Sequence, residues 1–102
     1  MQPPPDVDDI RTILRRHTGL LDARKVLSIA VFGSVARADA HADSDLDFLV
    51  ELDERRRPTL FDLIALEQDL SDLFGRSVDV VERDQLKPAI RRRAERDAIQ
   101  IL

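Results

Sequence analysis

The stretch from Asp45 to Leu52 constrains the fold most, because apolar residues recur there at every second position. A period of two is typical of a β-strand whose two faces meet different environments. One face carries Leu46, Phe48, Val50 and Leu52, and the other carries Asp45, Asp47, Leu49 and Glu51. Asp45 and Asp47 therefore project to the same side, about 6 to 7 Å apart along the chain. The stretch predicts a strand with an apolar face and a carboxylate pair.

Two other segments have the pattern of short buried strands. Residues 26–32, VLSIAVF, form an apolar run rich in β-branched side chains that ends at Gly33. Residues 77–81, SVDVV, carry Asp79 between apolar neighbours. An acid in that setting needs solvent, a partner or an ion. Asp79 is therefore expected to complete an acidic cluster with Asp45 and Asp47, and closely packed carboxylates favour a bound cation.

Helical patterns fill the intervals between these strands. Helices are expected over residues 6–18, 34–40, 58–74 and 84–99, with Gly19 and Gly75 ending the first and third. In the third helix a broad apolar stripe indicates core packing first and a partner surface second. In the last helix Ile90, Ala94, Ala98 and Ile99 are expected to face inward. The resulting order, α-β-α-β-α-β-α, predicts an α/β (α+β) fold.

Composition narrows the class of protein further. The 102 residues suit one domain over 1–102, with a proline-rich start that is expected to be disordered over residues 1–5. The absence of cysteine and of any apolar run near 20 residues favours a cytoplasmic protein without a membrane span. A net charge of -4 argues against direct nucleic-acid binding, and the arginine triplets at 55–57 and 91–93 are interpreted as solvated faces.

The junction of Gly33 and Ser34 is a candidate phosphate-binding site. It lies where the first strand ends and a helix begins, so backbone N–H groups and the Ser34 hydroxyl could hold phosphate oxygens. Arg37, one turn further on, could add a bidentate contact to the same phosphates. Together with the acids, this junction predicts a nucleotide site that uses Mg²⁺, since hard cations prefer carboxylate oxygens.

These residues resemble a known family. The segment GSVARADAHADSDLDFLV is similar to the Gly-Ser, ten residues, Asp-x-Asp signature of DNA-polymerase-β-like nucleotidyltransferases. Over nearly its whole length the chain resembles the minimal nucleotidyltransferases, the MntA-type antitoxins encoded beside HEPN-domain toxins. One position departs from the pattern: Ala38 stands where many relatives have glycine. Alanine costs little there unless the backbone needs a positive φ.

The resemblance implies a fold, an activity and a role for each candidate residue. The fold is a short mixed sheet flanked by helices, and the reaction is transfer of AMP from ATP to a tyrosine of the partner toxin, an RNase, which neutralises it. Gly33 and Ser34 would bind the nucleotide phosphates, Asp45 and Asp47 two Mg²⁺ ions, and Asp79 would act as metal ligand, general base or both. A hetero-oligomer with the HEPN toxin is expected.

Other functions stay open from the sequence. The chain contains no tyrosine, and a domain of this size has little room for an acceptor site, so the acceptor is expected on another protein. A non-catalytic antitoxin that binds its toxin stoichiometrically is one alternative. A small-molecule nucleotidyltransferase of the aminoglycoside-modifying kind is another, although such enzymes normally carry an additional acceptor domain. The nucleotide base preference and the oligomeric state cannot be read from the residues.

Overall fold

The computed structural model of the chain describes residues 3–102 and contains five helices and four strands within them. The helices are α1 (Val7–Arg15), α2 (Thr18–Ala23), α3 (Gly33–Ala36), α4 (Leu60–Phe74) and α5 (Pro88–Asp97). The strands are β1 (Val26–Phe32), β2 (Leu46–Leu52), β3 (Val78–Glu82) and β4 (Ile99–Gln100). Single 3₁₀ turns follow β2 at Glu54–Arg56 and β3 at Arg83–Gln85.

The strands form one mixed sheet in the order β3-β2-β1-β4. β2 runs antiparallel to β1, and β4 runs antiparallel to β1 on its other side. β3 runs parallel to β2, because α4 carries the chain back across the sheet between them. The expected mixed α/β fold is therefore confirmed, with β1 and β2 at the centre of the sheet.

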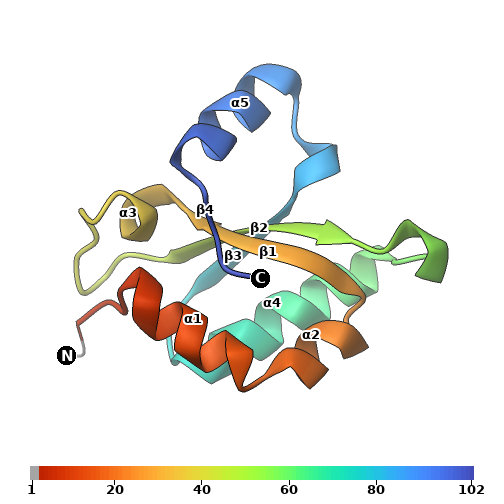
Figure 1. Ribbon diagram of the computed structural model, residues 1–102, viewed down its shortest axis with the longest axis horizontal. Helices are drawn as coiled ribbons and strands as arrows, with labels where there is room; N and C mark the ends of the chain where they lie inside the picture. Colours follow the sequence, from red (N-terminus) through yellow and green to blue (C-terminus); the bar gives the residue numbers. More distant parts are fainter. Residues whose placement is uncertain (1–2) are drawn as a thin grey trace.

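Helices cover the two faces of the sheet unequally (Figure 1). α1, α2 and α4 lie together on one face, whereas α5 alone lies over the other. The core is formed on the three-helix side by the apolar face of β2, with Ile10 and Leu14 of α1 and Leu66 and Leu70 of α4. Phe48 is fully buried there, and its ring centroid lies 5.8 Å from that of Phe74. The alternation predicted for β2 matches its burial except at Leu49, which is fully buried on the face that carries the acids.

The first helical region differs from the sequence prediction. Instead of one helix to about Thr18, α1 ends at Arg15 and α2 begins at Thr18, so Gly19 lies inside a helix and does not stop one. Burial of Leu21 outweighs the weak helix propensity of glycine. The helix is ended by Lys25, which has a left-handed backbone with φ 67°.

The end of the chain also differs from the prediction. α5 ends at Asp97, and Ile99, expected on the inner face of that helix, pairs instead with Val31 of β1. The short strand β4 covers the free edge of β1 and satisfies backbone groups that a helix would leave unpaired. Ala94 is buried as expected, but Ile90 is 52% exposed, so its predicted inward position is wrong.

The expected disordered start lies partly outside the described residues, which begin at Pro3. Residues 3–5 have no regular secondary structure, and the Pro3 carbonyl accepts a hydrogen bond from Arg76 Nη2 at 3.1 Å. At the other end of the segment, Asp6 caps α1 in a reciprocal pair with Asp9. Among the helices of residues 3–102, none combines the length and apolarity needed to cross a bilayer.

Candidate active site

The acidic residues gather at the start of the two parallel strands. Asp47 of β2 lies directly opposite Asp79 of β3 in the sheet register, and neighbouring strands are about 4.8 Å apart. Asp45 immediately precedes β2 and, like Asp79, is exposed, whereas Asp47 is partly buried. All three acids lie at the same end of the sheet, where β1 also finishes at Phe32 opposite Asp47.

The surroundings of Asp47 perturb the ionisation of its carboxyl group. Partial burial raises the pKa of the Asp47 carboxyl above its ordinary value, and the nearby charges of Asp79 and Asp45 raise it further, while Arg37 opposes the shift. A carboxylate in this position is stabilised by any cation that approaches it. A bound cation would therefore stabilise the ionised form of Asp47, as expected at a metal-binding position.

Gly33 brings the backbone against the Asp47 carboxylate. Its φ is 75°, a left-handed conformation that glycine adopts at low cost. A Cβ at this position would collide with Asp47 Oδ2 and lie 3.1 Å from Asp47 Cγ. The backbone angle favours glycine here, and a Cβ would in addition push the Asp47 carboxylate out of its position. The sharp turn lets α3 begin directly beside the acids.

Ser34 and Arg37 occupy opposite ends of the short helix α3. Ser34 is in its first turn, next to Gly33, and its hydroxyl has no hydrogen-bond partner among the described residues. Arg37 follows the last residue of α3, and its Nε and Nη1 atoms lie 3.3 Å from Asp39 Oδ2 and 3.5 Å from Asp97 Oδ2. The hydrogen bond from Arg37 to Asp39 raises the pKa of the guanidinium, which therefore stays charged.

Ala38 has a positive φ of 61°. This is the position at which the chain departs from the glycine of the family pattern, and the backbone there does adopt the conformation that favours glycine. The left-handed region costs a non-glycine residue about 1 to 2 kcal/mol. Ala38 therefore carries backbone strain immediately after the residue expected to bind phosphate.

A groove of about 370 Å³ opens beside the acids, between β3 and α4. Asp45, just before β2, and Asp79 of β3 line it on one side, and Ile64, Glu67 and Gln68 line it from α4. The sequence prediction missed these three residues because it treats the apolar stripe of α4 as core. The usable signal was the width of that stripe, which exceeds what one buried helix face needs.

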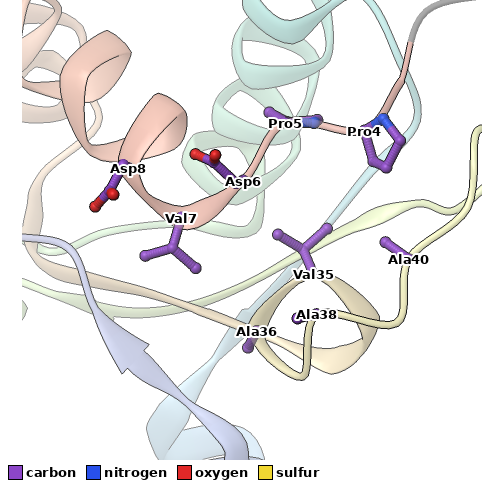
Figure 2. A pocket seen from close by; sticks show the side chains of 9 residues that line it. All are labelled: Pro4, Pro5, Asp6, Val7, Asp8, Val35, Ala36, Ala38 and Ala40. Atoms are coloured by element: carbon purple, nitrogen blue, oxygen red, sulfur yellow. The ribbon is translucent and has the colours of Figure 1, made fainter.

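A second pocket, of about 410 Å³, lies between the start of α1 and α3 (Figure 2). Small apolar side chains of α3 and the following loop face Pro4, Pro5 and the first turn of α1 across it. Its carboxylates, Asp6 and Asp8, would repel a phosphate. None of the predicted site residues lines it, so the pocket is separate from the acidic cluster.

The side chains near Asp47 supply few ligands for a metal ion. Within residues 3–102, no three acidic or histidine side chains come close enough to enclose an ion by themselves. Mg²⁺ at nucleotide sites usually takes only one or two carboxylates and completes its shell with phosphate oxygens and water. Two oxygen ligands from Asp45 and Asp47 match that donor set, and the raised pKa of Asp47 fits a place for a cation.

Comparison with known proteins defines the class. Residues 7–101 match the family described as the nucleotidyltransferase domain, and the chain belongs to that family. The chain is therefore an enzyme of the nucleotidyltransferase class, as expected from its Gly-Ser and Asp-x-Asp residues.

Relatives of similar length narrow the class to minimal nucleotidyltransferases. The chain is 38% identical over 96 residues to a protein adenylyltransferase, MntA, of Thermococcus cleftensis, a match that covers 93% of this chain and 95% of the relative. It is 41% identical over 97 residues to the protein MJ0128 of Methanocaldococcus jannaschii, also named as a protein adenylyltransferase, with 93% and 97% covered. The resemblance expected from sequence is thereby confirmed.

Solved structures agree on the fold. A minimal nucleotidyltransferase superposes with a TM-score of 0.78 at 37% identity, over 93% of this chain and 95% of that one. A toxin–antitoxin structure with AMP-PNP superposes with a TM-score of 0.74 at 20% identity, over 90% of this chain and 72% of the other. At that identity the second likeness supports the fold alone.

Proposed function

We propose that the chain is a Mg²⁺-dependent protein adenylyltransferase that transfers AMP from ATP to a tyrosine of a HEPN-domain RNase partner, which neutralises the partner in the cytoplasm. The observation that carries the proposal is the meeting of Asp47, Asp79 and the Gly33 backbone at one end of the sheet. The names of the relatives, which are protein adenylyltransferases, support the choice of AMP and of a protein acceptor.

The nucleotide is held at the start of α3. Backbone N–H groups at Gly33 and Ser34, with the free Ser34 hydroxyl, bind the phosphates beside Asp47. Arg37 reaches these phosphates only by giving up one of its contacts with Asp39 or Asp97, because both acids now occupy its guanidinium. Its contribution to ATP affinity is therefore smaller than that of an unpaired arginine.

Asp45 and Asp47 would hold Mg²⁺ beside the nucleotide phosphates. The ion would supply neutralisation of the phosphate charge, which lowers the barrier to displacement at the α-phosphorus. Asp47 would gain from the cation, since burial and two neighbouring acids raise the pKa of its carboxyl. Removal of either carboxylate should therefore weaken both metal binding and catalysis.

The reaction is an in-line displacement. The oxygen of the acceptor hydroxyl forms a bond to the α-phosphorus, the bond from that phosphorus to the oxygen bridging to the β-phosphate breaks, and pyrophosphate leaves. The hydroxyl proton passes to the Asp79 carboxylate, which lies on the outermost strand and is exposed to an incoming acceptor. The acceptor comes from another protein, because the chain has no tyrosine.

Transfer of labelled AMP tests the proposal directly. Purified protein is incubated with ATP labelled at the α-phosphate, Mg²⁺ and the HEPN-domain protein, and label on the partner is measured. We expect transfer by the wild type, and a loss of about a hundredfold or more in Asp45→Ala and Asp47→Ala. Asp43→Ala is the matched control, since Asp43 is an exposed acid two residues before Asp45. An unlabelled partner, or equal transfer by all variants, contradicts the proposal.

Stoichiometric binding is the second candidate function, favoured by the exposed apolar side chains on α4. It predicts that Asp47→Ala protects cells from the toxin as well as the wild type does. Survival on co-expression of the toxin separates the two candidates, because the catalytic mechanism requires loss of protection in Asp47→Ala while the complex still forms.

A further inference from the structure

Three exposed apolar side chains lie side by side at the start of α4. Leu60, Phe61 and Ile64 are 71%, 74% and 60% exposed, although sequence reasoning expected the stripe to pack into the core first. At 100° per residue, positions i, i+1 and i+4 fall within one arc of about 100° on a helix. They form a continuous patch, whereas the buried residues of this helix, Leu66 and Leu70, lie further along it.

The patch is continuous with the candidate active site. Ile64 lines the groove that Asp45 and Asp79 also line, and Gln68, one turn further along α4, lines it too. The path from the exposed start of α4 to the acids therefore runs along one surface of the molecule. A protein bound to the patch would therefore also contact the groove, which Asp45 and Asp79 line.

The order of elements across the sheet fixes the side from which an acceptor approaches. Gly33 follows β1, Asp47 lies on β2 and Asp79 lies on β3, with the groove between β3 and α4. In an in-line displacement the attacking oxygen lies opposite the leaving pyrophosphate. If the phosphates are held at Gly33, next to β1, the acceptor hydroxyl must reach the α-phosphorus from the opposite side, next to β3. The groove and the α4 patch are on that side.

We propose that Leu60, Phe61 and Ile64 form the docking surface for the acceptor protein, which delivers its hydroxyl to Asp79 through the groove between β3 and α4. The inference rests on the proposed function and adds where the acceptor binds. The acceptor protein is expected to be apolar where it covers the patch and basic where it lies over the groove. The basic side chains complement the acids in and around the groove.

The charges near the groove support this choice of partner. Asp45, Glu67 and Asp79 line it, and Asp72 accepts a hydrogen bond from Gln68 at 2.9 Å on the same helix. Glu67 also accepts from the Val80 backbone N–H at 3.2 Å, which holds its carboxylate at the groove. No lysine or arginine lines the groove among residues 3–102. A basic partner surface is therefore attracted to it.

A matched pair of substitutions tests the docking surface. Phe61→Asp places a carboxylate in the first turn of α4, and Ile90→Asp does the same in α5, where the side chain is 52% exposed. A carboxylate in the first turn of a helix favours the helix, so both variants are expected to fold. Ile64→Asp provides a second variant within the patch.

The measured quantities are the KM for the HEPN-domain protein in AMP transfer, its Kd in a pull-down, and the Kd for ATP with Mg²⁺. We expect Phe61→Asp and Ile64→Asp to raise the first two by about tenfold or more, as loss of an apolar anchor does. In Phe61→Asp, whose side chain lies outside the groove, the Kd for ATP should stay at the wild-type value, which shows that the fold is intact. Ile90→Asp should match the wild type throughout.

Two results overturn the inference. Equal KM and Kd for the partner in Phe61→Asp, Ile64→Asp and Ile90→Asp would remove the docking surface. Self-association of the wild type that Phe61→Asp abolishes, measured by light scattering without the partner, would assign the patch to a second copy of this chain. Failure of the wild type to label the partner contradicts the proposed function instead, and the pull-down Kd still decides whether the patch binds it.

Discussion

The two faces of β2 show how one strand serves both folding and the active site. Leu46, Phe48 and Val50 on one face are fully buried under three helices, whereas Asp47 on the other face is partly exposed and has a raised pKa. The first face stabilises the fold by removing apolar area from water. On the second face Leu49 is also buried, but the acids oppose folding because they hold like charges together. Neighbouring residues of β2, such as Leu46 and Asp47, therefore serve different purposes: one stabilises the core and the next belongs to the candidate active site.

The helices on the two faces of the sheet also differ in how firmly they are capped and buried. α4 has 15 residues, begins with a reciprocal cap between Thr59 and Asp62, and ends at Gly75 in a left-handed conformation. α5 has 10 residues, starts without a side-chain cap, and buries only Ala94. The face of the sheet that carries the acids is thus covered by the less anchored helix. A thinly covered face leaves the acids accessible to substrates.

Truncation of the buried face should have the largest effect on stability. Phe48→Ala removes a fully buried ring that contacts Phe74, and we expect a loss of about 3 to 5 kcal/mol in the free energy of unfolding. Urea denaturation measures it. Leu27→Ala, at a β1 side chain that is 54% exposed, should stay within about 0.5 kcal/mol of wild type. Similar losses in both variants would show that burial does not distinguish the two positions.

The turn beside the acids should come next. Gly33→Ala is expected to cost about 2 kcal/mol or more, because the positive φ and the collision with Asp47 act together, and to abolish AMP transfer. Gly75→Ala has a similar φ of 66° but open space, so it should cost only about 1 kcal/mol. Gly19→Ala, without either constraint, should stabilise α2 by about 0.5 to 1 kcal/mol. Equal losses in the free energy of unfolding for Gly33→Ala and Gly75→Ala would show that the contact with Asp47 adds no cost.

Asp47→Asn should stabilise the protein at neutral pH in Mg²⁺-free buffer while it abolishes activity. The folded state raises the pKa of Asp47 above its ordinary value of 3.8, so it favours the protonated form. That favourable contribution is complete below pH 3.8 and is lost as the pH rises through the folded pKa. The Tm of the variant should exceed that of wild type at pH 7 and converge with it at pH 3. A lower Tm at pH 7 would contradict the raised pKa.

Ala38→Gly should have the smallest effect. Glycine relieves the positive φ at this position but adds freedom to the unfolded chain, so we expect a net gain of about 0.5 to 1 kcal/mol. Thermal unfolding measures the gain, with Ala36→Gly as the control that should lose stability inside α3. A loss in both variants would mean that the strain at Ala38 is already relieved by its surroundings.

Local patterns predicted the central strands, and tertiary contacts explain the errors. The alternation of β2 determined its own two faces, because burial on one side requires a period of two. Gly19 was wrongly expected to stop a helix, since the sequence does not show that Leu21 would be buried. Ile99 joined β1 because that edge was open, a fact about strand order that no local pattern contains.

Those parts of the candidate site that depend on the residue spacing within one strand were predictable from the sequence. Asp45 and Asp47 share a face by their spacing, but the alignment of Asp79 with Asp47 depends on the parallel register set by α4. The groove and its lining by Ile64 and Gln68 could not be predicted, since they depend on how α4 lies against β3. The roles of these residues in catalysis and docking stay predictions.

The parallel pairing of β2 and β3 has a consequence for folding kinetics. Asp47 and Asp79 are 32 positions apart and meet only when the chain segment containing α4 has closed. Closing such a segment costs entropy before any contact rewards it. Repulsion between the carboxylates is then added to this late step, so docking of β3 should be slow at low ionic strength and faster in salt, which screens the charges. An acidic active site of this kind delays the assembly of the sheet that carries it.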